Sequence, residues 1–383
     1  MLIYRQILKA RARRWRKAPG AAVPTVCVGN VTVGGTGKTP HTELILGLLQ
    51  SSPRWGNTQL AVLSRGYRRR SRGFQQVMRD SSASFSGDEP LQIKKKFPAV
   101  TVAVDKNRTD GCRFLTSPEL LHTGDYKSGK AAGLSRKAVR SAGGCRDKDM
   151  LPAGIIVLDD ALQYIGLHAS LNIMLVDYSR PVFHDSLIPF GRLRDLPERL
   201  WDADIIIVTK CPRGMDNWEK TQFAGKLKVR DYRTSDCTGT TPGGRRIHLL
   251  FSYTDYCPLE PVFPETDQRY SYSKGVVLFS GIADDRPLKA WLSDSYKISE
   301  TLSFPDHHRF GKADLNSIHA ALRRHPTSAI VTTEKDAQRI LDCREVPAAI
   351  RERLFCLPIR AAFTTGAELS VLNSALDALA TNF

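Results

Sequence analysis

Residues 23–39 read VPTVCVGNVTVGGTGKT, and the order of residue types in this stretch decides the fold. A short apolar run ends in a glycine-rich turn, which closes with Gly37-Lys38-Thr39 before a helical pattern, HTELILGLLQ. Strand, glycine loop and helix in this order are typical of a phosphate-binding P-loop, in which backbone N–H groups surround a polyphosphate. The residues expected to bind the nucleotide are Thr32, Val33, Gly34, Gly35, Thr36, Gly37, Lys38 and Thr39.

This loop departs from the usual pattern at one position. The pattern G-x-x-x-x-G-K-[ST] begins with glycine, and Thr32 stands there instead. A bare G-x-G-K-T sequence could be an accidental turn, but the flanking strand and helix favour nucleotide binding. Lys38 would then reach the β- and γ-phosphates, and the Thr39 hydroxyl could ligate Mg²⁺.

Composition limits the class of protein. The chain has 383 residues, is 42% hydrophobic and carries a formal net charge of +17. This length predicts two globular domains, and the charge favours a nucleic acid, an anionic membrane surface or a phosphorylated substrate without choosing among them. The eight cysteines lack zinc-ligand spacing, which indicates reduced thiols in a cytosolic protein. No apolar run approaches the ~18 residues that span a bilayer.

The N-terminal sequence MLIYRQILKARARRWRK is basic, and the first acidic residue of the chain is Glu43. An organelle transit peptide is one interpretation, but a core strand beginning near Val23 leaves little to cleave. The alternative is an amphipathic helix over residues 1–20 with Ile3, Ile7, Leu8 and Trp15 near one face. Such a helix could lie on an anionic membrane or pack on its own domain.

Apolar, β-branched runs predict strands at 23–28, 59–63, 99–104, 154–158, 171–176 and 204–208, with clear helices at 40–51 and 88–97. Near-continuous apolar strands joined by helices indicate a parallel sheet covered on both faces. We therefore expect an α/β protein. Its parts are a P-loop NTPase-like three-layer core with a mostly parallel sheet at 21–212, a surface insertion at 117–150, a smaller α/β domain at 213–365 and a C-terminal helix at 366–383.

Two acidic motifs are candidates for chemistry. Residues 154–160, GIIVLDD, place an acid at the end of an apolar strand, as in the Walker B pattern whose carboxylate lies near Mg²⁺. This pattern suggests Asp159 or Asp160 as the metal neighbour, against the alternative of an ordinary acidic turn. Residues 86–90, SGDEP, hold Asp88 and Glu89, which could be a general base and a metal ligand or could simply begin a helix.

The remaining candidates are basic or histidine-containing. Residues 304–310, FPDHHRF, place His307 beside an acid that could orient it, although a polar turn is the commoner meaning. Arginines follow two predicted strands and could hold substrate phosphates: Arg65 and Arg68 in LSRGYRRR, and Arg192 and Arg194 in PFGRLRD. Residues 209–212, TKCP, lack the aspartate of a guanine-specific N/T-K-x-D motif.

Read in order, these motifs resemble those of the tetraacyldisaccharide 4′-kinase family, LpxK, of Gram-negative bacteria. The matching segments are VGNVTVGGTGKTPHTE, LSRGYRR, GDEP, LDDALQ and FPDHHRF, followed in register by SGIAD and TTEKDAQR. The resemblance covers nearly the whole chain and implies a core domain and a smaller domain joined by a hinge. It implies ATP-dependent phosphorylation of the 4′-hydroxyl of a tetraacylated glucosamine disaccharide 1-phosphate, at the cytoplasmic face of the inner membrane.

The resemblance also implies residue roles. Asp88 matches the general base and His307 its partner across the cleft. Asp159 and Asp160 match the acidic pair after the Walker B strand. The residues that match positions near Mg²⁺ are Thr39, Glu89 and Asp160. A monomer is expected. Binding to nucleic acid is not expected, because an anionic, membrane-embedded acceptor accounts for the basic surface.

Some features depart from the family pattern. Residues 193–196 read LRDL where L-R-E-P is usual, Ala161 follows the acidic pair where Gly or Phe is usual, and the insertion and short N-terminus are atypical. Two other classes therefore stay open. One is a P-loop ATPase or switch acting on another anionic partner, and the other is a scaffold that has lost activity.

Overall fold

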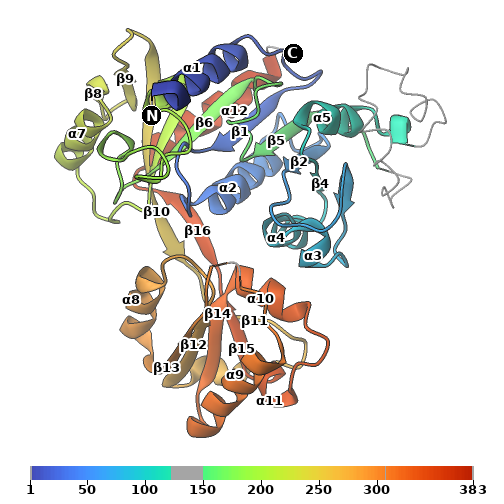
Figure 1. Ribbon diagram of the computed structural model, residues 1–383. Coiled ribbons are helices and arrows are strands. Elements are labelled where there is room, and N and C mark those ends of the chain that lie inside the picture. Colours follow the sequence, from blue (N-terminus) through green and yellow to red (C-terminus); the bar gives the residue numbers. More distant parts are fainter. Residues whose placement is uncertain (1, 122–149, 307, 382–383) are drawn as a thin grey trace.

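The computed structural model describes residues 2–121, 150–306 and 308–381 (Figure 1). The predicted insertion at 117–150 therefore falls mostly outside the described residues, and so does His307. The described strands form two sheets, one of 11 strands and one of five.

The larger sheet has the order β3-β4-β2-β5-β1-β6-β7-β10-β9-β8, and β16 pairs with β10. Its central strands run parallel: β4 (Thr101–Val104), β2 (Leu60–Ser64), β5 (Ile155–Asp159), β1 (Thr25–Gly29), β6 (Leu171–Asp177), β7 (Ile205–Thr209) and β10 (Arg246–Tyr256). Antiparallel strands complete it: β3 (Gln75–Val77), β9 (Thr238–Thr240), β8 (Arg230–Arg233) and β16 (Ile359–Phe363). The six strands predicted before residue 212 are confirmed.

Helices cover both faces of this sheet because successive side chains of a buried strand point to opposite sides. In β1, Val26 and Val28 join one apolar cluster while Cys27 joins the other. The first cluster includes side chains of α2 (Lys38–Ser51), α4 (Asp88–Lys96) and α12 (Gly366–Ala378). The second includes side chains of α1 (Leu2–Arg16), α5 (Arg108–Thr116) and α7 (Asn217–Lys226). The predicted three-layer core is confirmed.

The smaller sheet has the order β11-β15-β14-β12-β13. Its strands are β11 (Glu260–Pro261), β15 (Leu354–Leu357), β14 (Ala329–Thr333), β12 (Gly275–Ser280) and β13 (Lys297–Ser303). All neighbours are parallel except β11 and β15. The helices of this part are α8 (Arg286–Ser295), α9 (Lys312–Arg324), α10 (Glu334–Leu341) and the short α11 (Ala348–Arg351). The predicted second α/β unit is present.

The predicted boundary between the two parts differs from the sheet pairing. Residues 213–256 were expected in the smaller domain, but β8, β9 and β10 extend the larger sheet. Residues 235–275 are rich in Gly, Pro and Tyr, and this composition gave no clear strand pattern for β10. The apolar residues Ile247, Leu249 and Phe251 of this strand are buried in the larger core. We call residues 2–256 and 359–381 the P-loop domain, and residues 257–358 the small domain.

Two antiparallel strands connect the domains (Figure 1). The first half of β10 pairs with β7, from His248 to Phe251, and the second half pairs with β16, from Ser252 to Tyr256. Tyr256 lies opposite Ile359 at the end of this ribbon. Beyond β16, α12 packs on the larger sheet through Leu372 and Leu376, so the C-terminal helix belongs to the P-loop domain.

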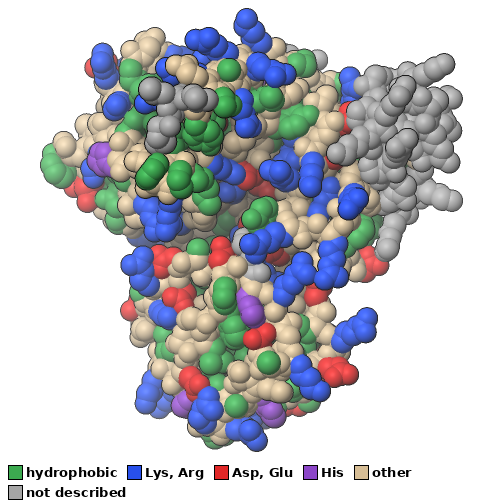
Figure 2. All heavy atoms as spheres, in the orientation of Figure 1, with side chains coloured by type: hydrophobic (Ala, Val, Ile, Leu, Met, Phe, Trp, Pro, Cys, Tyr) green, Lys and Arg blue, Asp and Glu red, His purple; other side chains and the backbone are tan. Residues whose placement is uncertain are grey.

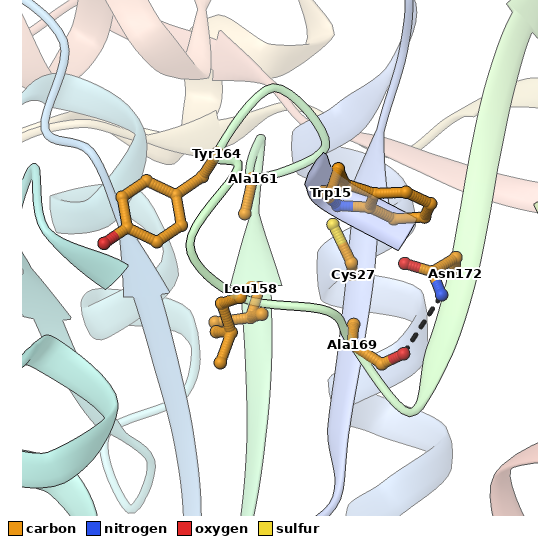
Figure 3. A pocket seen from close by; sticks show the side chains of 8 residues that line it. Trp15, Cys27, Leu158, Ala161, Tyr164, Ala169 and Asn172 are labelled. Atoms are coloured by element: carbon orange, nitrogen blue, oxygen red, sulfur yellow. Dashed lines mark hydrogen bonds between the residues drawn. The ribbon is translucent and has the colours of Figure 1, made fainter. Parts of the chain in front are cut away.

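Helix α1 packs on its own domain. Leu8, Ala12 and Trp15 are buried. Trp15 lies beside Cys27 and the strand-end residues around Ala169, in a space with no room for a water molecule (Figure 3). Only part of the predicted apolar face of this helix is buried. Leu8 and Trp15 face the core, whereas Ile7 is 52% exposed. Among the described residues, no helix has the length and apolar character needed to cross a bilayer.

Candidate active site

The glycine loop between β1 and α2 has the backbone of a phosphate cradle. Gly34 and Gly37 have φ angles of 112° and 81°, in the left-handed region that favours glycine, and Gly37 is the residue before α2. The N-terminus of α2, beginning at Lys38, therefore points its unpaired N–H groups into the loop.

Thr32 has a role inside the loop that a glycine could not fill. The Asn30 amide donates to the Thr36 hydroxyl at 2.7 Å and to the Thr32 hydroxyl at 3.2 Å. The backbone next to Thr32 is also held, because Val33 N–H donates to the Arg192 carbonyl at 2.8 Å. Side-chain bonds thus fix the unusual start of this loop.

The far side of the loop rests on β7 and β10. The Thr209 hydroxyl donates to the Thr36 carbonyl at 3.1 Å, and Lys210 contacts the Gly35 carbonyl. His41 lies within hydrogen-bonding distance of the Gly37 carbonyl, at 2.8 Å, and of the Ser252 hydroxyl, at 2.9 Å. Burial lowers the pKa of His41 to about 4, although the Gly37 carbonyl opposes this shift.

The first acid of the pair ends β5. The Asp159 side chain is buried, and one of its oxygens accepts from the Ser64 hydroxyl at 3.0 Å. Its other oxygen, Oδ1, has no hydrogen-bond partner among the described residues. Burial, with Glu89 and Asp160 nearby, raises the pKa of Asp159 to about 6 against the opposing charge of Lys38. A buried carboxylate of this kind fits a bound cation.

The second acid, Asp160, is bound by an arginine. Both of its carboxylate oxygens accept from Arg194, one of them at 3.1 Å, and Arg194 also donates to Asn30 beside the loop. Burial would raise the pKa of Asp160, but Lys38 and Arg194 together lower it. Arg194, expected to be a ligand for substrate phosphate, instead joins the acidic pair to the P-loop.

Asp88 and Glu89 form the first turn of α4, so the helix-start interpretation is correct for both. Each also pairs with a cation of the small domain: Asp88 with Arg339, and Glu89 with Lys335. Lys335, with a smaller effect of Lys38, lowers the pKa of Glu89. The charge of Lys38 favours the ionised form of Glu89, Asp159 and Asp160 alike, so the P-loop lysine lies within electrostatic range of all three carboxylates.

A cleft of about 630 Å³ opens between the domains beside Asp88. Its lining includes several basic side chains from both domains: Arg68, Arg70, Arg309, Lys312, Arg339 and Arg344. Figure 2 shows Lys and Arg side chains along both sides of the groove between the two domains. Arg65 and Arg194 are not among the described residues that line the cleft. Such a cleft attracts an anionic ligand.

Three basic residues at this site were not singled out from the sequence. Arg108 is buried beneath the acidic pair, where it approaches the Asp159 carbonyl at 3.4 Å and the Asp160 carbonyl at 3.5 Å. Lys335 and Arg339 lie in TTEKDAQR, and their i, i+4 spacing on a predicted helix was the available signal.

The described residues contain no cluster of three or more acidic, histidine or cysteine side chains arranged to hold a metal ion. A Mg²⁺ ion bound with a nucleotide keeps several waters and takes one or two protein ligands beside the phosphates. Thr39 and the unpartnered oxygen of Asp159 are the side-chain groups suited to it.

A P-loop at the end of a parallel sheet, with an acidic pair after the neighbouring strand, defines a P-loop nucleotide-dependent phosphotransferase or hydrolase. The sequence comparisons then identify the family. Residues 1–377 match the family described as LpxK, tetraacyldisaccharide-1-P 4′-kinase, and the chain belongs to this family.

Relatives of this family share about a third of their residues with the chain. A tetraacyldisaccharide 4′-kinase of Phocaeicola vulgatus is 34% identical over 89% of this chain and 82% of the relative. The one of Flavobacterium johnsoniae is 33% identical over 91% and 85%. The fold is similar to a crystal structure described as the "apo" form of LpxK from Aquifex aeolicus in complex with ATP, with a TM-score of 0.64, 22% identity and coverage of 99% and 96%.

Proposed function

We propose that this protein transfers the γ-phosphate of ATP to the 4′-hydroxyl of a tetraacylated glucosamine disaccharide 1-phosphate, a step of lipid A biosynthesis. The observation that carries the proposal is the charge interaction of the P-loop lysine with two acidic motifs, one of which lines the cleft between the domains, in a chain of the LpxK family. The cleft is basic and large enough for a phosphorylated sugar head group.

Phosphoryl transfer depends mainly on positioning and charge neutralisation. The loop N–H groups and Lys38 would hold the β- and γ-phosphates. Thr39 and Asp159 would hold Mg²⁺, with Glu89 beside them, and the ion would neutralise charge on the phosphates. Asp160 would position Arg194, and through it Asn30 beside the loop, and would not bind the metal. The reason is that Arg194 contacts both carboxylate oxygens of Asp160.

Asp88 lines the cleft, next to Glu89 in the chain, and would accept the proton of the sugar hydroxyl. A general base of this kind contributes about 10²–10⁴ in rate. The expected partner, His307, lies outside the described residues, and its role stays a prediction. Arg68 lines the same cleft and is our candidate for contact with substrate phosphate.

The decisive test incubates purified protein with ATP, Mg²⁺ and the disaccharide 1-phosphate in detergent, and analyses the lipid by mass spectrometry. We expect one added phosphate at the 4′ position. Asp88→Ala should lose most turnover yet bind ATP as the wild type does, whereas the surface control Asp294→Ala should keep full turnover. ATP binding without any lipid product would reject the kinase function. It would favour the alternative of an ATPase acting on another anionic partner.

We also propose that the protein acts as a monomer at the cytoplasmic face of the inner membrane, bound peripherally. On α1 the side chains of Tyr4 and Ile7 are 39% and 52% exposed, among exposed Arg and Lys residues, a composition suited to an anionic bilayer surface. Ile7→Asp should weaken binding to phosphatidylglycerol vesicles several-fold. Leu369→Asp on α12 is the control, since Leu369 is also 37% exposed. Equal binding by all three proteins would remove α1 from membrane contact.

A further inference from the structure

The small domain contributes an arginine to the centre of the site. Arg339 donates to an Asp88 carboxylate oxygen at 2.5 Å, and the two residues are 251 positions apart in the chain. Only 9% of the Arg339 side chain is exposed, with 13% of that of Asp88, so the pair is largely shielded from water. Charge-assisted bonds in such surroundings are stronger and more directional than surface ion pairs.

Arg339 is itself held in place by its own domain. The same guanidinium donates to an Asp336 oxygen at 2.6 Å and to the Gly281 carbonyl at 3.2 Å. Asp336 is fully buried and accepts from the Gly281 N–H and the Thr333 hydroxyl, both at 2.8 Å. The arginine fork therefore has a fixed direction before it meets the P-loop domain.

These contacts join two motifs whose function the phosphate cradle does not explain. Gly281 begins the turn of SGIAD after β12, and Asp336 and Arg339 lie in TTEKDAQR on α10. Lys335, one turn before Arg339, pairs with Glu89 in the same manner. The pairs lie side by side because residues four apart share one face of a helix.

We propose that Arg339 is a positioning residue, which orients the carboxylate of Asp88 toward the acceptor hydroxyl when the two domains are closed. This inference rests on the proposed function, since it assigns a partner to the proposed base. Arg339 acts through Asp88 and does not itself touch the reacting atoms. Because Arg339 is fixed to the small domain, the base reaches its working orientation only in the closed arrangement.

The test compares steady-state turnover and ATP affinity of full-length variants with the lipid acceptor in detergent. A displaced base can cost about a hundredfold in rate, so Arg339→Ala should lower kcat about 10- to 100-fold. The Kd for ATP should stay within twofold. Arg339→Lys keeps the charge without the planar fork and should recover part of the rate.

A control variant lies in the same helix pair. Lys95 of α4 donates to Gln338 of α10 at 2.5 Å, so Lys95→Ala removes a bond between the domains without touching the carboxylates. Its kcat should stay within twofold of the wild type. A loss equal to that of Arg339→Ala would mean that any contact between these helices matters, and would overturn the assignment.

Dependence on Asp88 separates positioning from general stabilisation of the closed form. In an Asp88→Asn background, the further change Arg339→Ala should alter kcat by less than twofold. The role would be rejected if the loss of kcat in the double variant equalled the product of the losses in the two single variants. Wild-type kcat in Arg339→Ala would also reject it. If Arg339→Ala does not fold, wild-type kcat in Arg339→Lys rejects it. A wild-type protein that makes no lipid product would instead reject the proposed function itself.

Discussion

The edge of the large sheet and the contact between α4 and α10 form two halves of one site, but they are built differently. At the sheet edge, the loop, Lys38 and the acidic pair follow strands directly, so each group is placed by the strand that precedes it. At the helix contact, each pair joins residues from different domains, such as Asp88 with Arg339. We expect the first half to bind a nucleotide alone, whereas the ion pairs of the second half form only where the two domains meet.

This difference suggests that the two parts of the site have different roles. The groups that we propose for phosphate binding follow strands of one sheet, as expected for a cradle that must be formed before the ligand arrives. Asp88, the proposed base, pairs with an arginine of the small domain, so on this proposal phosphate transfer requires both domains to be in contact. Closure that completes a catalytic site is a common way to exclude water as the acceptor.

The largest effect should come from the sheet edge. Lys38→Ala removes the cation whose charge acts on Glu89, Asp159 and Asp160 and should lower kcat/KM about 10²–10³-fold, because one charge-stabilising group in such a site has that effect. Lipid kinase assays check this, with Lys226→Ala on the surface of α7 as the control. A loss smaller than that of Arg339→Ala would reverse the proposed ranking of the two halves.

The next effect concerns stability at the helix contact. Lys96 of α4 binds Glu43 of α2 and Glu334 of α10, each at 2.7 Å. Burial raises the pKa of Glu43 from 4.5 to about 7, despite the opposing charge of Lys96. An acid whose folded pKa is raised keeps its full contribution below its unfolded pKa and loses it as pH rises through the folded pKa.

The wild type should therefore lose stability between about pH 4.5 and 7, by at most about 3 kcal/mol for a single group. Glu43→Gln should flatten this dependence and be the more stable protein above pH 7. Thermal unfolding from pH 5 to 8.5 measures it. Glu198→Gln, which removes an exposed partner of Arg5, should leave the wild-type curve unchanged. Parallel curves for wild type and Glu43→Gln would contradict the assignment.

The smallest effect is expected where the P-loop rests on β10. Neutral His41 donates from Nδ1 to the Gly37 carbonyl, so its Nε2 accepts from the Ser252 hydroxyl of β10. Ser252→Ala leaves a buried acceptor without a partner and should cost about 1–2 kcal/mol of stability. It should also weaken ATP binding a few-fold. Calorimetry on this variant and on Ser317→Ala, an exposed helix position, provides the comparison. Unchanged ATP affinity would confine His41 to packing.

The part of the site at the edge of the large sheet could be predicted well from the sequence, for physical reasons. Apolar runs and glycine turns depend on nearby residues, so six strands, the P-loop and the acidic pair were correctly placed. The domain boundary was wrong because β10 is defined by pairing with β7 and with β16, over a hundred residues further along the chain. No local pattern reports the partners of Asp88 and Glu89, since Arg339 and Lys335 follow them by 251 and 246 residues.

The pairing of Tyr256 with Ile359 makes the small domain an insertion at the tip of a β-hairpin. Both chain crossings occur at one point, so residues 257–358 could be replaced by a two-residue Asn-Gly turn without changing any strand order in the large sheet. Such a shortened protein would retain its nucleotide cradle and lack the second half of the site.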